Sequence, residues 1–341
     1  MKAIILAAGK GTRMRPLTNK IPKPLIPICN LPTLIFVIEK ILKSGINNIG
    51  LVISPDDQEY FKVFIEEFNL QNSLSLILQK EPLGVAHAVK QAKSFIKDDD
   101  FLLYLGDNLI KDNLKKFKEK FENDSANALL LLKEIADPKM FGVAEIDSQG
   151  KLIGIEEKPL EPKSNLAVSG LYFFKNIILD EIEKIEFSER GELEITDAII
   201  SLMNRGNING VKLKGWWIDT GSREQVLEAN SLVMTEIFNG QYLDLYTDYE
   251  IRDKVLIGLN SNIKNVNING QVIIGHNTNL ISTNIDENVS ISNNNTIKNS
   301  IISNSIILEG NHCDNFEIIN SLVGSKYKKD VNNKIKDIID S

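Results

Sequence analysis

The chain has 341 residues, enough for about two domains of ordinary size. Hydrophobic residues make up 43% and charged residues 25% of it, proportions that exclude a disordered or collagen-like protein. Its 39 basic and 46 acidic side chains give a net charge of −7, which argues against nucleic acid or an anionic membrane as the main partner.

Strand and helix patterns alternate along the first 240 residues. Continuous apolar runs predict buried strands at residues 3–6, 49–54, 74–78 and 101–105. Apolar stripes at helical spacing predict helices over Leu34–Leu42, Phe61–Phe68 and Val85–Ile96. This order predicts an α/β domain with a mostly parallel sheet, covered by helices on both faces. Ligands of such sheets bind beyond the carboxyl ends of the strands, so the loops after these strands are the candidate site.

The loop after the first strand contains Gly9, Gly11 and Arg13. Such glycines can bring backbone N–H groups against a phosphate, and the cation can balance its charge. The loop lacks the third glycine of the dinucleotide-binding fingerprint, where Met14 stands, and it also lacks the Gly-Lys-Ser/Thr of the P-loop. By itself it is either a phosphate loop or a plain glycine turn.

A proline-dense segment follows, with Pro16, Pro22, Pro24, Pro27 and Pro32. Proline excludes inner strands and helix interiors, so we expect a stiffened loop at the carboxyl edge of the sheet. Lys23 within it is either a solvated lysine or a second phosphate-binding cation.

Two aspartates come directly after predicted strands. Asp107 follows the run 101–105, and Asp219 stands in the segment Trp216–Gly221. A helix N-cap is the simple interpretation of Asp107, and a Mg²⁺ ligand is the alternative. Two carboxylates, several cations and a glycine loop together suggest metal-assisted chemistry on a phosphate.

The composition changes near residue 250: from Val255 to His312 only five side chains are charged. Aliphatic residues recur there every six positions, in four frames that slip by one or two residues. The frames are Ile251, Ile257, Ile263; Ile268, Ile274, Leu280; Ile285, Ile291, Ile297; and Ile301, Ile307, Cys313, Ile319. This period predicts a short left-handed β-helix over 251–323, of about four coils with asparagine at the corners, rather than a disordered asparagine-rich tract. We expect residues 324–341 to form a charged tail, either a solvated helix or a frayed end.

The two cysteines, Cys29 and Cys313, lie far apart and form no metal-type pair, so we expect reduced thiols and a cytoplasmic location. The chain has no stretch of 18 apolar residues that could span a membrane. The apolar residues after Met1 run into Gly9 without a signal-peptide cleavage site.

Nine segments in order resemble the sugar-1-phosphate nucleotidyltransferase family, and most of all its long-form glucose-1-phosphate thymidylyltransferases. The segments are Leu6–Thr18, Pro22–Pro27, Gln79–Ala88, Tyr104–Asn108, Phe141–Ala144, Glu156–Pro159, Ser169–Tyr172, Gly191–Asp197 and Trp216–Gly221. The resemblance covers about 240 residues, and the β-helix is what distinguishes the long form. It implies a Rossmann-like catalytic domain over residues 1–240.

The resemblance also implies roles for particular residues. The triphosphate would be held by Ala8, Gly9, Gly11, Thr12 and Arg13. Lys23 would approach the α-phosphate, Gln79 and Gly84 would read the base, and Asp107 and Asp219 would hold Mg²⁺. The sugar would contact Gly142, Glu157 and Val168, and its phosphate Lys158 and Arg190. The catalytic groups would be Arg13, Lys23, Asp107 and Lys158, and the reaction would join dTTP and glucose 1-phosphate into dTDP-glucose and pyrophosphate.

One departure leaves the base open. These thymidylyltransferases usually carry glutamine after the loop lysine, whereas Pro24 stands here, so UTP is an alternative to dTTP. A bifunctional enzyme whose β-helix transfers acyl groups through His276 or His312, and a non-catalytic regulatory or assembly subunit, are further alternatives. We expect a homo-oligomer, because flat aliphatic sides and an open end of a β-helix favour association.

Overall fold

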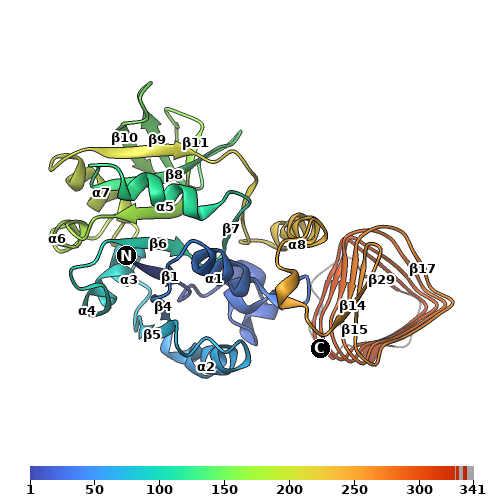
Figure 1. Cartoon of the computed structure of the whole chain (residues 1–341). Helices are drawn as coiled ribbons and strands as arrows, with labels where there is room; N and C mark the ends of the chain where they lie inside the picture. The colour runs from blue at the N-terminus through green and yellow to red at the C-terminus, as the bar shows by residue number, and fades with distance from the viewer. Residues whose placement is uncertain (327, 330–332, 336–341) are drawn as a thin grey trace. The chain divides into compact units, whose positions relative to one another are not determined.

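A computed structural model describes residues 1–326, 328–329 and 333–335 (Figure 1). The chain forms two compact units, each discontinuous in sequence. The first comprises Met1–Gly9 and Val37–Ile218, and the second comprises Lys10–Phe36 and the chain from Asp219 onward. The sequence predicts domains over 1–240 and 251–323; within the second unit, buried hydrogen bonds tie the segment 10–36 to the helix after Asp219.

The first unit is built on a mixed sheet. Its strands, from one edge to the other, are β10 (Leu152–Glu157), β9 (Gly142–Ile146), β11 (Leu166–Phe174), β6 (Phe101–Leu105), β1 (Lys2–Leu6), β4 (Ile49–Ile53) and β5 (Leu74–Leu78). In addition, β8 (Ala128–Glu134) pairs with β11 and β12 (Ile208–Lys212), and β13 (Trp217–Asp219) pairs with β7 (Asn108–Ile110). The strands β6, β1, β4 and β5 are parallel, which confirms the Rossmann-like sheet. The strands β11, β9 and β10 extend it by antiparallel pairing.

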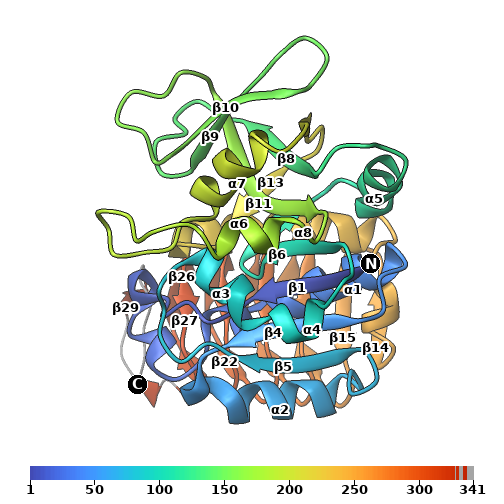
Figure 2. The ribbon, with the colours of Figure 1, turned by 90° about the vertical axis from the view of Figure 1, so that its left-hand side faces the viewer.

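Helices cover both faces of this sheet. Their bounds are α1 (Thr33–Lys43), α2 (Gln58–Glu67), α3 (Val85–Gln91), α4 (Lys93–Ile96), α5 (Leu114–Glu122), α6 (Ile178–Ile182) and α7 (Ile195–Met203). On one face Val89 and Ile199 join Ile4 and Leu103 in a buried cluster, and Figure 2 shows α3 and α4 lying across β1 and β4. On the other face α5 packs on β11 through an aromatic contact between Phe121 and Phe173. No helix of the described chain is long and apolar enough to cross a membrane.

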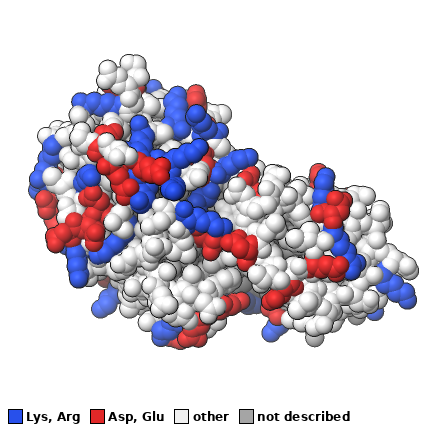
Figure 3. Space-filling model, in the orientation of Figure 1, with Lys and Arg blue, Asp and Glu red and all other residues white. Residues whose placement is uncertain are grey.

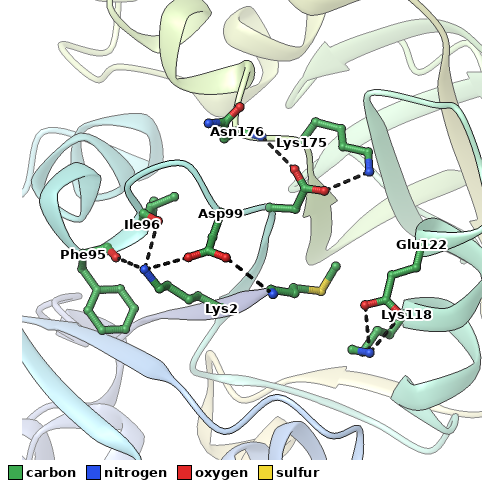
Figure 4. A network of polar contacts seen from close by, with 10 residues as sticks. Lys2, Phe95, Ile96, Asp99, Lys118, Glu122, Lys175 and Asn176 are labelled. Carbon is green, nitrogen blue, oxygen red and sulfur yellow. Dashed lines mark hydrogen bonds and ion pairs between the residues drawn. The ribbon is translucent and has the colours of Figure 1, made fainter.

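Polar contacts fasten the amino end of the parallel strands (Figure 4). The Lys2 ammonium lies 2.9 Å from a carboxylate oxygen of Asp99 and donates a 2.7 Å hydrogen bond to the carbonyl oxygen of Phe95. Next to it, Lys175 and Asp100 form an ion pair of 2.8 Å. These contacts hold the end of the sheet that is opposite to the candidate loops.

The proline-rich segment of the second unit is neither helix nor inner strand, as expected. It contains the short 3₁₀ turns Thr12–Met14, Leu17–Asn19 and Lys23–Leu25, and a hairpin of β2 (Pro27–Ile28) and β3 (Leu31–Pro32). The helix α8 (Arg223–Phe238) of the same unit begins at Ser222, whose hydroxyl caps it by accepting from the N–H of Gln225.

A left-handed β-helix occupies the rest of this unit, and its strands stack into three sheets. The first sheet contains β14 (Tyr249–Arg252), β15 (Val255–Gly258), β18 (Val272–Ile274), β21 (Val289–Ile291), β24 (Ile306–Ile307) and β27 (Leu322–Val323). The second contains β16 (Asn262–Lys264), β19 (Asn279–Ile281), β22 (Thr296–Lys298), β25 (His312–Asp314) and β28 (Lys328–Lys329). The third contains β17 (Asn267–Ile268), β20 (Asn284–Ile285), β23 (Ile301–Ser303), β26 (Phe316–Ile319) and β29 (Asn333–Ile335). In Figure 3, uncharged residues cover much of the β-helix surface in view.

The pairing register explains why the six-residue period slips. Val255 pairs with Val272, a coil of 17 residues, whereas Ile306 pairs with Leu322, a coil of 16. A coil of 17 residues is one residue shorter than three six-residue repeats, and Ile285 accordingly pairs with Ile302, which is buried, while Ile301 is 46% exposed. Two further positions differ from the expected frames. Ile251 is exposed because β14 pairs antiparallel outside the coils, and Ile318 rather than its neighbour is fully buried.

Asparagine occupies the corners as expected. Left-handed backbone occurs in columns one coil apart: Asn260, Asn277 and Asn294; Asn265, Ser282, Asn299 and Asn315; and Asn288, Asn304 and Asn320. Asparagine tolerates this conformation better than most residues, which explains its abundance here.

The structure differs from the helix or frayed end expected after residue 323. Strands β28 and β29 pair with β25 and β26 and continue the coil. The remaining residues of the expected tail, 327, 330–332 and 336–341, lie outside the described residues.

Candidate active site

Two of the predicted triphosphate residues, Ala8 and Gly9, come directly after β1 in the first unit. Gly9 is exposed, and within the described part of the chain no atom lies within 4 Å of the place that a Cβ would take. Its backbone is therefore open to a ligand at the carboxyl end of a central strand.

The other triphosphate residues belong to the second unit, where Gly11 holds the loop in a tight turn. Its φ is +57°, and a Cβ there would lie 2.9 Å from Cγ2 of Thr18 and 3.1 Å from Cβ of Lys23. Thr18 also donates a 2.8 Å hydrogen bond to the Gly11 carbonyl oxygen. Only glycine fits this close approach, which sets the exposed Thr12 and Arg13 at the start of a 3₁₀ turn.

Three charged groups of the second unit converge near Gly221. The Lys23 ammonium lies 3.6 Å from Oδ1 of Asp219, and both side chains are largely shielded from solvent. The position of a Cβ on Gly221 is 3.2 Å from Oδ2 of Asp219 and 3.3 Å from Nη2 of Arg13. Two cations and one carboxylate thus surround a side-chain-free position, a composition that suits phosphate and a divalent cation.

Asp107 lies in the first unit between β6 and β7, so the N-cap interpretation is wrong, because no helix begins after it. The buried Asn108 donates a 2.9 Å hydrogen bond to Oδ1 of Asp107. Asn108 in turn accepts a 2.8 Å hydrogen bond from the Trp217 indole, which fixes its amide. The carboxylate is therefore held in one orientation at the carboxyl end of β6.

The predicted base-reading residues lie together in the first unit. Gln79 follows β5, is 6% exposed and donates a 3.3 Å hydrogen bond to the carbonyl oxygen of Gly84. Gly84 has a φ of +103°, and a Cβ on it would lie 2.6 Å from the carbonyl oxygen of Leu193. The loop is thus closely packed at Gly84, and any larger residue there would displace the backbone.

The five predicted sugar-phosphate residues also come together. The position of a Cβ on Gly142 lies 3.3 Å from Oε2 of Glu157 and 3.6 Å from Cγ2 of Val168. Oε1 of Glu157 is 3.6 Å from the Arg190 guanidinium and 3.9 Å from the Lys158 ammonium. A carboxylate that can accept from sugar hydroxyls therefore stands beside two cations that can hold a phosphate.

The charge of Glu157 is set by its surroundings. Burial raises the pKa of this carboxyl, and the neighbouring Glu194 raises it further, while Lys158 and Arg190 act in the opposite direction. Arg190 also contacts Glu192 at 3.0 Å and Glu194 at 3.4 Å. Three carboxylates, of Glu157, Glu192 and Glu194, thus lie within 4 Å of the Arg190 guanidinium.

Four residues that contact a site residue or the β2–β3 hairpin were missed by the sequence analysis. The hydroxyl of Thr196 is buried without a hydrogen-bond partner among the described residues, and its methyl group is 3.4 Å from the Cβ position of Gly142. Asn30, Asn230 and Tyr246 anchor the hairpin that continues the loop of Lys23, through hydrogen bonds within the second unit. Asn230 carried a signal, since it is a polar residue on the buried face of α8, between Ala229 and Val233.

The two histidines considered for acyl transfer lie in the β-helix. Nδ1 of His276 accepts a 2.9 Å hydrogen bond from the N–H of Leu259, and its ring packs edge-on against Tyr249. His312 is exposed and pairs with Thr296 in the sheet. The contacts of His276 are those of a residue that joins neighbouring coils.

Mg²⁺, the metal expected from the sequence, needs few protein ligands. Among the described residues, no group of three or more His, Cys, Asp or Glu side chains could enclose a metal ion. Mg²⁺ commonly takes only one or two carboxylates and completes its shell with substrate phosphates and water. The carboxylate of Asp107 in the first unit and that of Asp219 in the second are each half-buried oxygen donors.

Comparison with known proteins agrees with this geometry. Residues 2–236 match the model of the nucleotidyl transferase family. The chain is 41% identical over 240 residues to a low-salt glycan biosynthesis nucleotidyltransferase from Haloferax volcanii, covering 69% of this chain and 67% of that protein. It is 38% identical over 275 residues to a glucose-1-phosphate thymidylyltransferase from Streptomyces antibioticus, covering 79% and 76%.

Solved structures extend the likeness to three dimensions. A Bacillus anthracis protein crystallised with sucrose, provisionally assigned as a glucose-1-phosphate thymidylyltransferase, superposes with a TM-score of 0.63 at 34% identity, covering 68% of this chain and 94% of its own. A UDP-glucose pyrophosphorylase in complex with UDP-glucose shares the fold, with a TM-score of 0.63 at 24% identity, covering 69% of this chain and 98% of its own. The chain belongs to the nucleotidyl transferase family, among the enzymes that act on sugar 1-phosphates.

Proposed function

We propose that this enzyme transfers a thymidylyl group from dTTP to glucose 1-phosphate, forming dTDP-glucose and pyrophosphate. The observation that carries the proposal is the cluster around Gly142, where the half-buried Glu157 carboxylate stands beside Lys158 and Arg190. Glu157 would accept hydrogen bonds from sugar hydroxyls, and the two cations would bind the sugar phosphate. The Streptomyces relative, named a glucose-1-phosphate thymidylyltransferase, supports the choice of both substrates.

The reaction needs no general base. The second pKa of a phosphate monoester is about 6, so glucose 1-phosphate is a dianion near neutral pH and is already a nucleophile. One of its phosphate oxygens attacks the α-phosphorus of dTTP, a new P–O bond forms, and the bond to the oxygen of pyrophosphate breaks in line with it. The enzyme must therefore orient two polyanions and reduce the repulsion between them.

Residues of this chain would divide that task. Arg13 and Lys23 would bind the triphosphate, and Lys158 and Arg190 would hold the attacking phosphate. Asp107 and Asp219 would hold Mg²⁺, which supplies charge neutralisation at the phosphate oxygens when it is bound. Lys23 would exchange part of its contact with Asp219 for the α-phosphate.

A substrate matrix tests the proposal. The full-length protein is incubated with Mg²⁺, each of dTTP, UTP, CTP, ATP and GTP, and either glucose 1-phosphate or N-acetylglucosamine 1-phosphate, and pyrophosphate release is measured. We expect the highest kcat/KM for dTTP with glucose 1-phosphate. A higher kcat/KM for UTP than for dTTP would show that the enzyme prefers uracil to thymine. A higher kcat/KM for N-acetylglucosamine 1-phosphate would show that it prefers the acetylated sugar phosphate to glucose 1-phosphate. No release of pyrophosphate with any pair would refute the proposal.

A further inference from the structure

The side chain of Gln79 is hydrogen-bonded to His87, a residue that takes no part in the proposed reaction. His87 lies in α3, and its Nδ1 is 3.0 Å from Nε2 of Gln79. The other ring nitrogen of His87 lies 3.2 Å from the amide nitrogen of Gln91, on the exposed side of the helix. His87 therefore links the buried Gln79 to the helix surface.

The carbonyl oxygen of Gly84 determines which way the Gln79 amide points. Nε2 of Gln79 lies 3.3 Å from this oxygen, which can only accept. Rotating the amide by 180° would place Oε1 against the carbonyl oxygen and bring two acceptors together. The two hydrogens of Nε2 are consequently directed at Gly84 and at Nδ1 of His87.

This orientation fixes the tautomer of His87. Nδ1 must accept, so the neutral ring carries its hydrogen on Nε2. An Nε2–H group cannot share a hydrogen bond with the NH₂ of Gln91, but the exposed Gln91 can rotate to present its oxygen. The chain of hydrogen bonds from Gly84 through Gln79 and His87 to Gln91 then has one donor and one acceptor at every link.

The remaining polar atom of Gln79 is its carbonyl oxygen. Within the described chain, every hydrogen bond of the Gln79 side chain runs through Nε2. Oε1 is therefore the atom available to a ligand, and it can only accept. Thymine and uracil offer an N–H at N3, whereas the N3 of cytosine is itself an acceptor.

We propose that His87 is a positioning residue for base selection: it holds Gln79 with Oε1 offered to the base, which favours thymine or uracil nucleotides over cytosine nucleotides. This inference rests on the proposed function, because it assigns Gln79 to the base of the nucleotide. His87 itself does not touch the base. It acts through Gln79, and its effect is on the choice between bases.

The tautomer can be tested without any assay of activity. The protein is labelled with ¹⁵N-histidine and its NMR spectrum is recorded at pH 8. The signals of the His87 ring nitrogens are the ones that disappear in His87→Asn. The chain has three histidines, so the spectrum is simple. We expect an unprotonated Nδ1 and a protonated Nε2. A protonated Nδ1 would overturn the proposal.

Base selection is tested with three variants. His87→Leu removes the acceptor that holds Nε2 of Gln79. We expect the ratio of kcat/KM for dTTP to kcat/KM for CTP to fall about tenfold, the effect of losing one hydrogen bond. The fall should come mainly from a higher KM for dTTP. In His87→Asn the carbonyl oxygen can replace Nδ1, and the ratio should stay within about threefold of wild type. The same change at an exposed histidine, His312→Leu, should leave the ratio unchanged.

The outcomes separate the two proposals. A wild-type enzyme that releases pyrophosphate from dTTP, together with an unchanged ratio in folded His87→Leu, would overturn the role of His87 alone. A wild-type enzyme that uses no pyrimidine nucleotide would refute the proposed function, and the base-selecting role would fall with it. If His87→Leu does not fold, the ratio in His87→Asn and the tautomer in wild type decide the question.

Discussion

The side-chain amide of Asn30 donates a 2.8 Å hydrogen bond to the carbonyl oxygen of Ile291 in the β-helix. Asn30 and Cys29 form the turn of the β2–β3 hairpin, with φ values of +64° and +49°. Two-residue hairpin turns with positive φ at both positions favour Asn and Gly. The asparagine thus serves both the turn and the contact, and it fastens the segment after Lys23 to a stack of rigid coils.

Asn30→Gly should separate these two roles. Glycine adopts the turn without strain, so only the side-chain contacts of Asn30 are lost, to the carbonyl oxygens of Ile291 and Ile273 and to Tyr249, and we expect a loss of about 1 kcal/mol of stability. Amide hydrogen exchange should become faster in residues 23–30. The matched control is Asn304→Gly, a left-handed asparagine at a half-buried corner, whose side chain bonds that of Asn320. Equal exchange in residues 23–30 of both variants would show that the contact does not order the loop.

Asn230 should matter more than any other residue of this anchor. Its Oδ1 accepts from the N–H of Cys29 at 2.8 Å and from the hydroxyl of Ser290 at 2.7 Å, and its Nδ2 donates to the carbonyl of Asn288 at 3.1 Å. Asn230→Leu leaves these buried groups without partners, so we expect a loss of about 3 kcal/mol, against about 1 kcal/mol for Ser290→Ala. Urea unfolding measures both. If Asn230→Leu and Ser290→Ala lowered the free energy of unfolding equally, the contacts of Asn230 with Cys29 and Asn288 would contribute nothing to stability.

The sequence was informative where structure is local or periodic. The four strands predicted before residue 106 match those observed to within one residue, because buried parallel strands need continuous apolar runs. The β-helix was recognisable because each coil repeats the same requirement for one aliphatic side chain and one corner. The antiparallel strands after residue 105 were not assigned, since their register depends on partners distant in sequence.

The same distinction holds for the candidate site. Gly11 and Asp107 could be selected from loops that follow strands, and Gly84 from the family resemblance. The partners that hold them could not: Leu193 packs on Gly84 from more than 100 positions away, and Asn230 meets Cys29 across 201 positions. A sequence pattern names the residue types that chemistry requires, but the residues that orient them are brought close only by the tertiary fold.

Both cysteines should resist thiol reagents in the native protein. Burial raises the pKa of Cys29 well above its usual value and that of Cys313 to about 11. The thiolate is the reactive form, so neither should react with iodoacetamide at pH 8, and both should react in urea. Because unfolded thiols ionise near pH 8.5 and the folded ones do not, stability should fall as the pH rises above about 9. Rapid labelling of native protein at pH 8 would contradict this.

Lys158 combines a strained backbone with a proposed role in phosphate binding, and two substitutions can separate them. Its φ is +43°, a conformation that costs a non-glycine residue about 1 kcal/mol. Lys158→Ala and Lys158→Gly both remove the ammonium, so each should lower kcat/KM about a hundredfold. Only Lys158→Gly relieves the strain, and it should be more stable than Lys158→Ala by about 1 kcal/mol.

Lys151→Ala, at an exposed lysine, is the control for activity. Near-normal activity in either Lys158 variant would exclude the proposed contact with the sugar phosphate.

The proposed metal ligands can be tested through binding as well as turnover. Asp107→Asn keeps an oxygen that can accept from Asn108 but removes the charge, so the fold should be retained. We expect kcat to fall a hundredfold or more, in the range for loss of a major electrostatic group. Calorimetric titration of Mg²⁺ into the enzyme with dTTP should show weakened binding, and Asp219→Asn should behave alike.

Asp98→Asn, at an exposed turn, should bind Mg²⁺ as wild type does. EDTA should abolish turnover, and excess Mg²⁺ should restore it. Mg²⁺ takes only one or two protein carboxylates in such sites, so loss of one of them should weaken binding. Unchanged Mg²⁺ binding in folded Asp107→Asn would therefore show that Asp107 is not a metal ligand.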